Sequence, residues 1–521
     1  MDIPHVLHAA GVLAPAALMA AAALATRLPG LATTTLWRAL QALAAAALVA
    51  SVAAAVAGPV RVPGPVALEA TTLGLIVAVL VQLLGTVVAG FSARYLEGEA
   101  GQRRYVAALA GVLASVHLLL LADHWLVLVA AWAAVGMTLQ PLLCFYPDRP
   151  FARLAAHKKR LADRAADALL LLAAALAWRE VGSGSLSALG AHVGQSGMST
   201  ALHVSALALV LAVLLRTASL PVHGWLVQVM EAPTPVSALL HAGVVNLGGF
   251  VLIRFAPLLE QAPAARGVLL AFGLTTAVLA GMVMLTRVSV KVRLAWSTVA
   301  QMGFMLLEVA LGLYTLAALH LVGHSLYKAH AFLSASTAVR RTRRHALHQS
   351  AAPTALSLAL APLAALAVVL LVLAPAAYAP WPWWWSAVLG LAWAPLLWLP
   401  GAPVAARERA GQALAGLAMV AGLTAAAWGV HALPLGLRDA PHHGLGAVTL
   451  AGMLALYACL ALLQRAPAAL APWRRWSYAG FYVDEAFTRL ALRLWPTRWA
   501  PTAPPRPDAH PDPALLADAR R

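Results

Sequence analysis

Apolar segments of about twenty residues recur along most of this chain, and they constrain its fold more than any other feature. About twenty helical residues, each rising about 1.5 Å, cross the roughly 30 Å hydrocarbon core of a bilayer. Of the 521 residues, 62% are hydrophobic and only 11% are charged, which is more apolar surface than a soluble domain can bury. The pattern predicts an all-α polytopic membrane protein.

Counting these segments predicts about fifteen transmembrane helices. Their expected centres lie near residues 15, 46, 80, 112, 134, 169, 210, 246, 276, 301, 324, 363, 390, 418 and 453. The first segment, 6–25, follows the acidic Asp2 and lacks the basic region of a signal peptide. We therefore expect it to be the first spanning helix.

The formal net charge of +17 is explained by topology rather than by binding to nucleic acid. Cationic residues gather in alternate loops: Arg94, Arg103, Arg104, Arg149, Arg153, Lys158, Lys159, Arg160, Arg287, Lys291, Arg293, Arg340, Arg341, Arg343, Arg344, Arg407, Arg409, Arg474 and Arg475. The intervening loops carry few cations or none. By the positive-inside rule, the N-terminus is expected outside and the C-terminus in the cytoplasm.

The composition changes after Leu463, where tryptophan, arginine and acidic residues mix at helical spacing. The apolar positions that can share one helix face are Phe487, Leu490, Leu494 and Trp495. They predict an amphipathic helix on the cytoplasmic surface. The last stretch, 500–521, is rich in proline and is predicted to be disordered.

Arg216 lies in an apolar segment shortly before Pro221. An ionisable residue inside a bilayer costs roughly 2.5–3.5 kcal/mol on insertion scales. A helix broken near Pro221 is tolerated at membrane depth only where it faces protein or a wet cavity. Together the two residues favour a polar cavity, although an arginine that snorkels to the interface is the alternative.

His320, His324 and Lys328 are spaced i, i+4, i+8, so they line one face of a predicted helix. Three titratable groups on one face of an apolar helix indicate a path for protons or other ions. Glu308 is either their counter-charge or an acid at a helix end near the interface. His241, in the preceding broken segment, is either a carrier or a structural histidine.

Arg164 and Asp167, at i and i+3, can form an ion pair that is as easily structural as functional. Cys144 and Cys459 lie in apolar segments without pairing or metal-ligand spacing, so we expect both in the core. No phosphate loop, zinc motif or nucleophile motif occurs in the sequence. We therefore expect no metal, no cofactor and no catalytic centre on this chain.

The stretch LPVHGWLVQVMEAPTPVSALLHAGVVNLGGFVLIR resembles the signature of the proton-translocating antiporter-like proteins. These include the large membrane-arm subunits of respiratory complex I and the Mrp cation/proton antiporters. The stretches KVRLAWSTVAQMGFM and LHLVGHSLYKAHAFLSAS resemble the helices that follow in that family. The resemblance implies that the helix break marked by Pro221, Pro233 and Pro235 belongs to an ion-translocation path.

The family fold contains two inverted repeats of five helices, each with one discontinuous helix. The resemblance implies the same arrangement here, with Pro362 marking the second break. The implied parts are N-terminal transmembrane helices in 1–93, a first repeat in 94–260, a second repeat in 261–400, C-terminal transmembrane helices in 401–465, and the amphipathic helix and tail in 466–521.

The resemblance also implies roles for single residues. Arg216 stands at the position of the family's key lysine, His241 lies on the next helix, and His324 and Lys328 lie on a later one. Ala133 stands where the family has a glutamate, and no lysine lies near Pro362. These departures make a complete channel of the complex I type doubtful.

With these departures, the chain resembles the DabB family, the membrane subunits of two-component inorganic carbon uptake complexes of bacteria. That resemblance implies a DabA partner similar to a zinc carbonic anhydrase, with zinc on the partner, and a location in the inner membrane. A cation gradient would then drive CO₂ hydration and bicarbonate accumulation. Either H⁺ or Na⁺ could serve. The alternatives are a complex I subunit, an Mrp-type antiporter subunit and a purely structural membrane scaffold.

Overall fold

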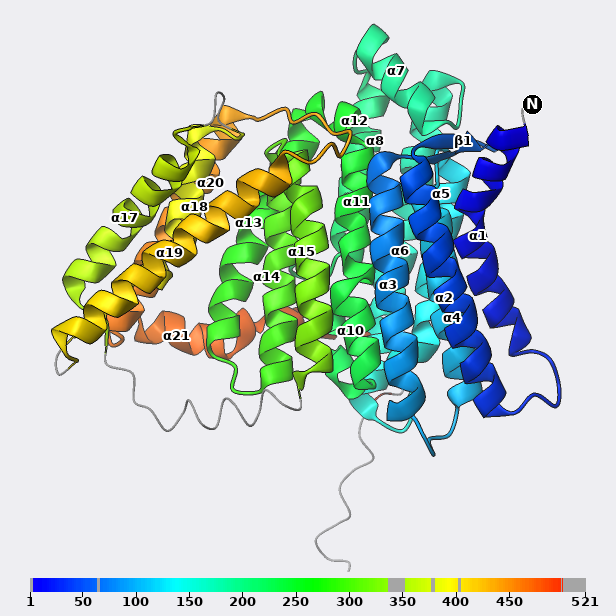
Figure 1. Ribbon diagram of the computed structural model, residues 1–521, viewed down its shortest axis with the longest axis horizontal. Coiled ribbons are helices and arrows are strands. Elements are labelled where there is room, and N and C mark those ends of the chain that lie inside the picture. Colours follow the sequence, from blue (N-terminus) through cyan, green and yellow to red (C-terminus); the bar gives the residue numbers. More distant parts are fainter. Residues whose placement is uncertain are drawn as a thin grey trace, which may run out of the picture.

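The computed structural model describes residues 3–62, 66–335, 352–375, 380–401, 404–497 and 499. These residues are almost entirely helical (Figure 1). The first helices are α1 (Ile3–Ala25), α2 (Thr33–Ala57), α3 (Thr72–Tyr95), α4 (Gln102–Leu120), α5 (Trp125–Leu143), α6 (Pro150–Val181), α7 (Leu186–Ser196) and α8 (Thr200–Arg216). A short antiparallel hairpin of β1 (Val60–Val62) and β2 (Leu68–Ala70) joins α2 to α3.

The central helices follow a segment of short pieces. They are α9 (Gly224–Gln228), η1 (Val229–Glu231), α10 (Thr234–Ala242), η2 (Val244–Asn246), α11 (Leu247–Arg254), α12 (Ala256–Glu260), α13 (Pro263–Leu285), α14 (Val290–Ala310) and α15 (Tyr314–Leu333). The last group comprises α17 (Ala355–Leu373), α18 (Trp383–Trp393), η3 (Ala394–Leu397), α19 (Ala406–His431), α20 (His443–Arg465), α21 (Ala471–Tyr478), η4 (Gly480–Tyr482) and α22 (Val483–Leu494).

The helices form an elongated bundle in chain order, with α1–α6 at one end, α10–α15 in the middle and α17–α20 at the other end (Figure 1). Small residues allow close helix pairs, since membrane helices associate through tight packing. Gly303 of α14 is an example, because a Cβ there would lie 2.6 Å from the backbone nitrogen of Ala277 in α13. All residues of α10 and all of α11 except Arg254 are buried, so these two pieces run through the interior.

The prediction of an all-α membrane fold is confirmed. Ten of the described helices are long and apolar enough to cross a membrane. Every expected centre falls in a helix or helical turn. Residues 260 and 465, where two of the expected parts end, are the last residues of α12 and α20. The count of fifteen crossings, the inverted repeats and the domain boundaries stay predictions. The arginines at 340–344 and the tail at 500–521 lie outside the described residues.

The predicted helix break at Pro221 agrees with the chain path, whereas the one at Pro362 is wrong. The helix α8 ends at Arg216, and helical structure resumes only with α9 at Gly224. Pro233 and Pro235 begin α10 rather than interrupt a helix. In contrast, α17 runs without a break through Pro362.

A side-chain hydrogen bond explains why α17 continues. Proline has no N–H, so Pro362 leaves the carbonyl of Leu358, four residues earlier, without its helical donor. The Tyr457 hydroxyl of α20 donates to that carbonyl at 2.7 Å, and the Trp398 indole N–H donates to the same hydroxyl at 3.0 Å. The neighbouring helix thus supplies the missing donor.

We predict that Tyr457→Phe destabilises the protein by about 1–3 kcal/mol, because the Leu358 carbonyl then stays unpaired in an apolar setting. The measurement is the midpoint of thermal unfolding of the purified protein in detergent. Tyr482→Phe is the matched control, since Tyr482 is 55% exposed. Equal midpoints for the two variants would contradict the role given to Tyr457.

Candidate functional site

Arg216 ends α8 inside the bundle, next to the helix break. Its guanidinium donates to the backbone oxygen of Trp132 in α5 at 2.7 Å and pairs with the carboxylate of Asp167 in α6. Its side chain is only 3% exposed, and it also lies over the Trp132 ring. These contacts favour the buried polar site over the snorkelling alternative.

The predicted pair of Arg164 and Asp167 is wrong. Both residues lie on α6 at the right spacing, but Arg164 is exposed and Asp167 turns toward α8. The buried guanidinium of Arg216 needs a counter-charge more than an exposed arginine does, because burying an unpaired charge is costly. Asp167 is therefore the counter-charge of Arg216.

A second buried ion pair on α6 was missed by the sequence analysis. Lys159 pairs with Asp163, and the two side chains are almost fully buried. The lysine ammonium lies 5.0 Å from the ring centre of Trp225, in the resumed helix α9. Lys159, Asp163 and Asp167 are spaced i, i+4, i+8, like His320, His324 and Lys328. This spacing could have revealed the pair from the sequence alone.

Asp163 lies directly against α5. A Cβ on Gly136 would lie 2.8 Å from its Oδ2 atom, so the glycine leaves room for the carboxylate. Gly136 lies one helical turn after Ala133 on α5. Ala133 stands where the resemblance implies a glutamate. A carboxylate borne by α6 thus occupies the region beside α5. We call Lys159, Asp163, Asp167 and Arg216 the first cluster.

The predicted ladder on α15 is brought together with Glu308 of α14. The carboxylate of Glu308 lies 2.8 Å from Nδ1 of His320, and the rings of His320 and His324 are 6.0 Å apart. Lys328 is fully buried and donates to the Ser297 hydroxyl at 2.7 Å and to the Leu294 carbonyl at 3.2 Å. We call Glu308, His320, His324 and Lys328 the second cluster.

Two buried histidines lie near the clusters. His241 is stacked on Phe332 of α15 at 4.5 Å and interacts electrostatically with Lys328. His223 stands just before α9, packs on Trp296 of α14 and interacts electrostatically with Lys158. The ring of His241 has no hydrogen-bond partner among the described residues. Both rings are buried in the interior of the bundle.

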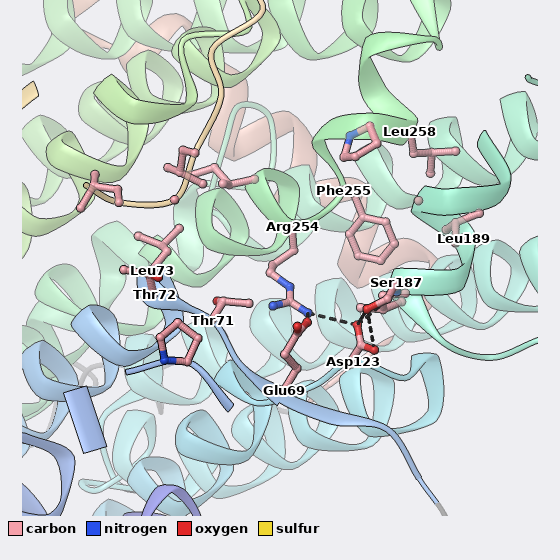
Figure 2. Close-up of a pocket in the computed structure, with 18 residues that line it drawn as sticks. Glu69, Thr71, Thr72, Leu73, Asp123, Ser187, Leu189, Arg254, Phe255 and Leu258 are labelled. Atoms are coloured by element: carbon pink, nitrogen blue, oxygen red, sulfur yellow. Dashed lines mark hydrogen bonds and ion pairs between the residues drawn. The ribbon is translucent and has the colours of Figure 1, made fainter. Parts of the chain in front are cut away.

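A further polar group lines a cavity of about 420 Å³ (Figure 2), at the end of the bundle that carries β1 and α12 (Figure 1). Arg254 of α11 lies 3.3 Å from the carboxylate of Asp123 and 3.6 Å from that of Glu69. Asp123 accepts from the Ser187 hydroxyl at 2.7 Å. These bonds join four segments that are distant in sequence, so this group holds the end of the bundle together.

The described residues contain no group of three or more His, Cys, Asp or Glu side chains that could hold a metal ion. Cys144 and Cys459 are unpaired and half-buried rather than deep in the core. The first cluster consists of ion pairs, and the second combines the Glu308–His320 contact, the ring contact of His320 with His324 and the hydrogen bonds of Lys328.

Comparison with known proteins places this fold and site in one class. Residues 122–399 match the family model described as NADH:quinone oxidoreductase/Mrp antiporter, TM. In the Mrp complex from Dietzia sp. DQ12-45-1b, a chain that is 23% identical superposes with a TM-score of 0.59, over 95% of this chain and 61% of that one. At this identity the likeness shows the fold alone. The protein is an antiporter-like membrane subunit.

Relatives of higher identity narrow the class. The chain is 39% identical to the probable inorganic carbon transporter subunit DabB of Hydrogenovibrio crunogenus over 435 residues, covering 82% of this chain and 83% of the relative. It is 46% identical to subunit DabB2 of Halothiobacillus neapolitanus over 278 residues, covering 53% of this chain but only half of that relative. The chain belongs to the DabB family of inorganic carbon transporter subunits.

The buried pair on α6 leads to a prediction about stability. Lys159→Met leaves Asp163 as a buried charge without a partner and should cost about 3–5 kcal/mol. Adding Asp163→Asn removes that charge and should recover most of the loss. The measurement is thermal unfolding in detergent, with Arg160→Met, an exposed neighbour, as the control. A Lys159→Met midpoint equal to that of Arg160→Met would contradict the pair.

Proposed function

We propose that this subunit translocates a cation, with the proton as the favoured ion, and so energises an inorganic carbon uptake complex. In this proposal, hydration of CO₂ to bicarbonate takes place on a DabA-type partner that resembles a zinc carbonic anhydrase. The partner carries the zinc, and this chain carries no catalytic centre of its own. The family membership supports the transport of inorganic carbon, and the buried clusters support the passage of protons.

The observation that carries the proposal is the second cluster. Glu308 of α14 contacts His320 of α15, and His324 and Lys328 follow on the same helix at intervals of four residues. These four titratable groups lie in the interior of a membrane fold, where such groups are costly. The partners of Lys328 are a hydroxyl and a carbonyl, neither of which fixes a proton on its amine as a carboxylate would. A structural scaffold has no need of such a group.

Arg216 has a different role in the proposal. A guanidinium keeps its proton in proteins, so Arg216 acts as a fixed charge and not as a carrier. The carboxylate of Asp167 is its counter-charge, and that of Asp163 pairs with Lys159 on the same helix, α6. Protons then move through exchangeable groups: His241, His320, His324 and Lys328, with Glu308 as the counter-charge.

The proposed orientation places the basic end of the bundle in the cytoplasm of the bacterium, with the subunit in the inner membrane and the N-terminus outside. Lys158 of α6 pairs with Asp484 of α22, and Arg287 lies beside Gly480, so the C-terminal helices share one end with the basic loops. The helix α21 runs along that end in Figure 1. The cationic end faces the cytoplasm in this proposal.

We predict that Lys328→Ala and Lys328→Arg both abolish gradient-driven carbon uptake while the complex still assembles. The arginine keeps the charge but removes the exchangeable state. The measurements are growth rescue in low CO₂ of cells lacking carbonic anhydrase and co-purification with the partner. Arg216→Lys serves as the contrast and should retain substantial function, because it keeps a cation beside Asp167. Full rescue by Lys328→Arg would contradict proton exchange at Lys328 and would show that this residue acts only as a fixed charge.

The division of labour with the partner gives a separate prediction. The isolated subunit should bind no stoichiometric zinc and show no carbonic anhydrase activity, because its sequence lacks a Cys/His ligand set. Metal analysis of the purified subunit, with and without the partner, measures this directly. One tightly bound zinc per isolated chain would overturn the assignment of the metal to the partner.

A further inference from the structure

The helix α22, the last one in the described part of the chain, contacts a lysine that is distant in sequence. The ammonium of Lys158 donates to both carboxylate oxygens of Asp484, at 2.7 and 3.0 Å, and to the Thr488 hydroxyl at 3.1 Å. The Lys158 side chain is 0% exposed, whereas that of Asp484 is 25% exposed. At this end of the bundle, Asp484 is thus the solvent-accessible member of the pair.

The carboxylate of Asp484 also reaches the helix break. Gly224 is the first residue of α9, and a Cβ there would lie only 1.5 Å from Oδ1 of Asp484. Only glycine permits this close approach. The Gln228 amide donates to the same carboxylate at 3.4 Å. Asp484 therefore packs against α9, the helix that begins after the break.

Ionisable groups continue inward from this contact. Lys159 follows Lys158 directly and pairs with Asp163, which leads along α6 to Asp167. His223, next to Gly224, is fully buried and interacts electrostatically with both Asp484 and Lys158. A cation bound at Asp484 thus has buried titratable groups on two sides.

We propose that Asp484 and Lys158 form the mouth of the ion path at the basic end of the bundle, so that α22 belongs to the translocation machinery. The inference rests on the proposed function and adds a residue to it from a helix outside the transmembrane bundle. Asp484 receives the cation from solvent, and Lys158 exchanges its partner as the cation passes. The groups that face Asp484 are Lys158 of α6, Gln228 of α9 and His223 of the break.

A purely mechanical role for α22 is the competing interpretation. Glu485, the next residue, interacts electrostatically with Arg287 between α13 and α14. The two acids of α22 could therefore only tie α6 to α13 and α14. This pair of neighbours also supplies the matched comparison, because Asp484 and Glu485 carry the same charge on the same helical turn but only Asp484 touches the break.

The test measures carbon uptake by the assembled complex in Asp484→Asn and Glu485→Gln. We expect Asp484→Asn to lower uptake per assembled complex by at least about tenfold, equal to about 1.4 kcal/mol in a barrier. Glu485→Gln should stay near the wild-type rate. Wild-type uptake in Asp484→Asn, or an equal loss in both variants, would overturn the inference.

Exchanging the two charges distinguishes a role in ion translocation from a purely mechanical role of α22. Lys158→Asp combined with Asp484→Lys rebuilds an ion pair between α6 and α22, and a mechanical tie would regain both unfolding midpoint and uptake. We expect the midpoint to recover and the uptake not to recover. Recovery of uptake would overturn the inference. If the double variant does not assemble, the comparison of Asp484→Asn with Glu485→Gln decides alone.

The wild-type complex distinguishes this inference from the proposed function. Uptake by the wild type should collapse when a protonophore removes the proton gradient. Uptake that survives both the protonophore and a sodium ionophore would refute cation coupling altogether, whatever the variants do. Coupled uptake in the wild type together with full uptake in Asp484→Asn would refute only the role of α22.

Discussion

The constraint on which the structure depends is that ionisable side chains inside a membrane fold need a charged or hydrogen-bonding partner. The helix α6 carries Lys159, Asp163 and Asp167 on one face, and α8 ends with Arg216 against the same face. An ion removed from water is tolerated only with a partner and further hydrogen bonds. The broken end of α8 therefore has a fixed place, because Arg216 must reach both Asp167 and the Trp132 carbonyl.

The two clusters solve the same problem in different ways. The first consists of ion pairs in which each charge has a permanent partner. The second has a single carboxylate, Glu308, for three basic side chains, and Lys328 contacts only neutral groups. A cluster of matched charges holds helices together and sets a field, whereas an unmatched one can change its protonation. The matched charges therefore lie between α6 and α8, and the basic side chains without a matching carboxylate lie on α15.

Hydropathy and helical spacing were enough to predict the all-α membrane fold and the shared face of His320, His324 and Lys328, because both depend on local periodicity. The interruption at Pro221 was also local. The partner of Asp167 could not be predicted from local sequence, because only tertiary packing brings Arg216 to it. Pro362 misled the prediction for the same reason: the donor that keeps α17 intact is Tyr457, from a helix nearly one hundred residues later.

The contact between Lys158 and Asp484 also has a consequence for how the chain is made. The lysine is synthesised and placed in the bundle long before the ribosome reaches its carboxylate, 326 residues later. Until then its ammonium must remain hydrated or find a temporary partner, since burial without one is costly. The buried ammonium of Lys158 therefore meets its native carboxylate only in a molecule whose translation has passed Asp484.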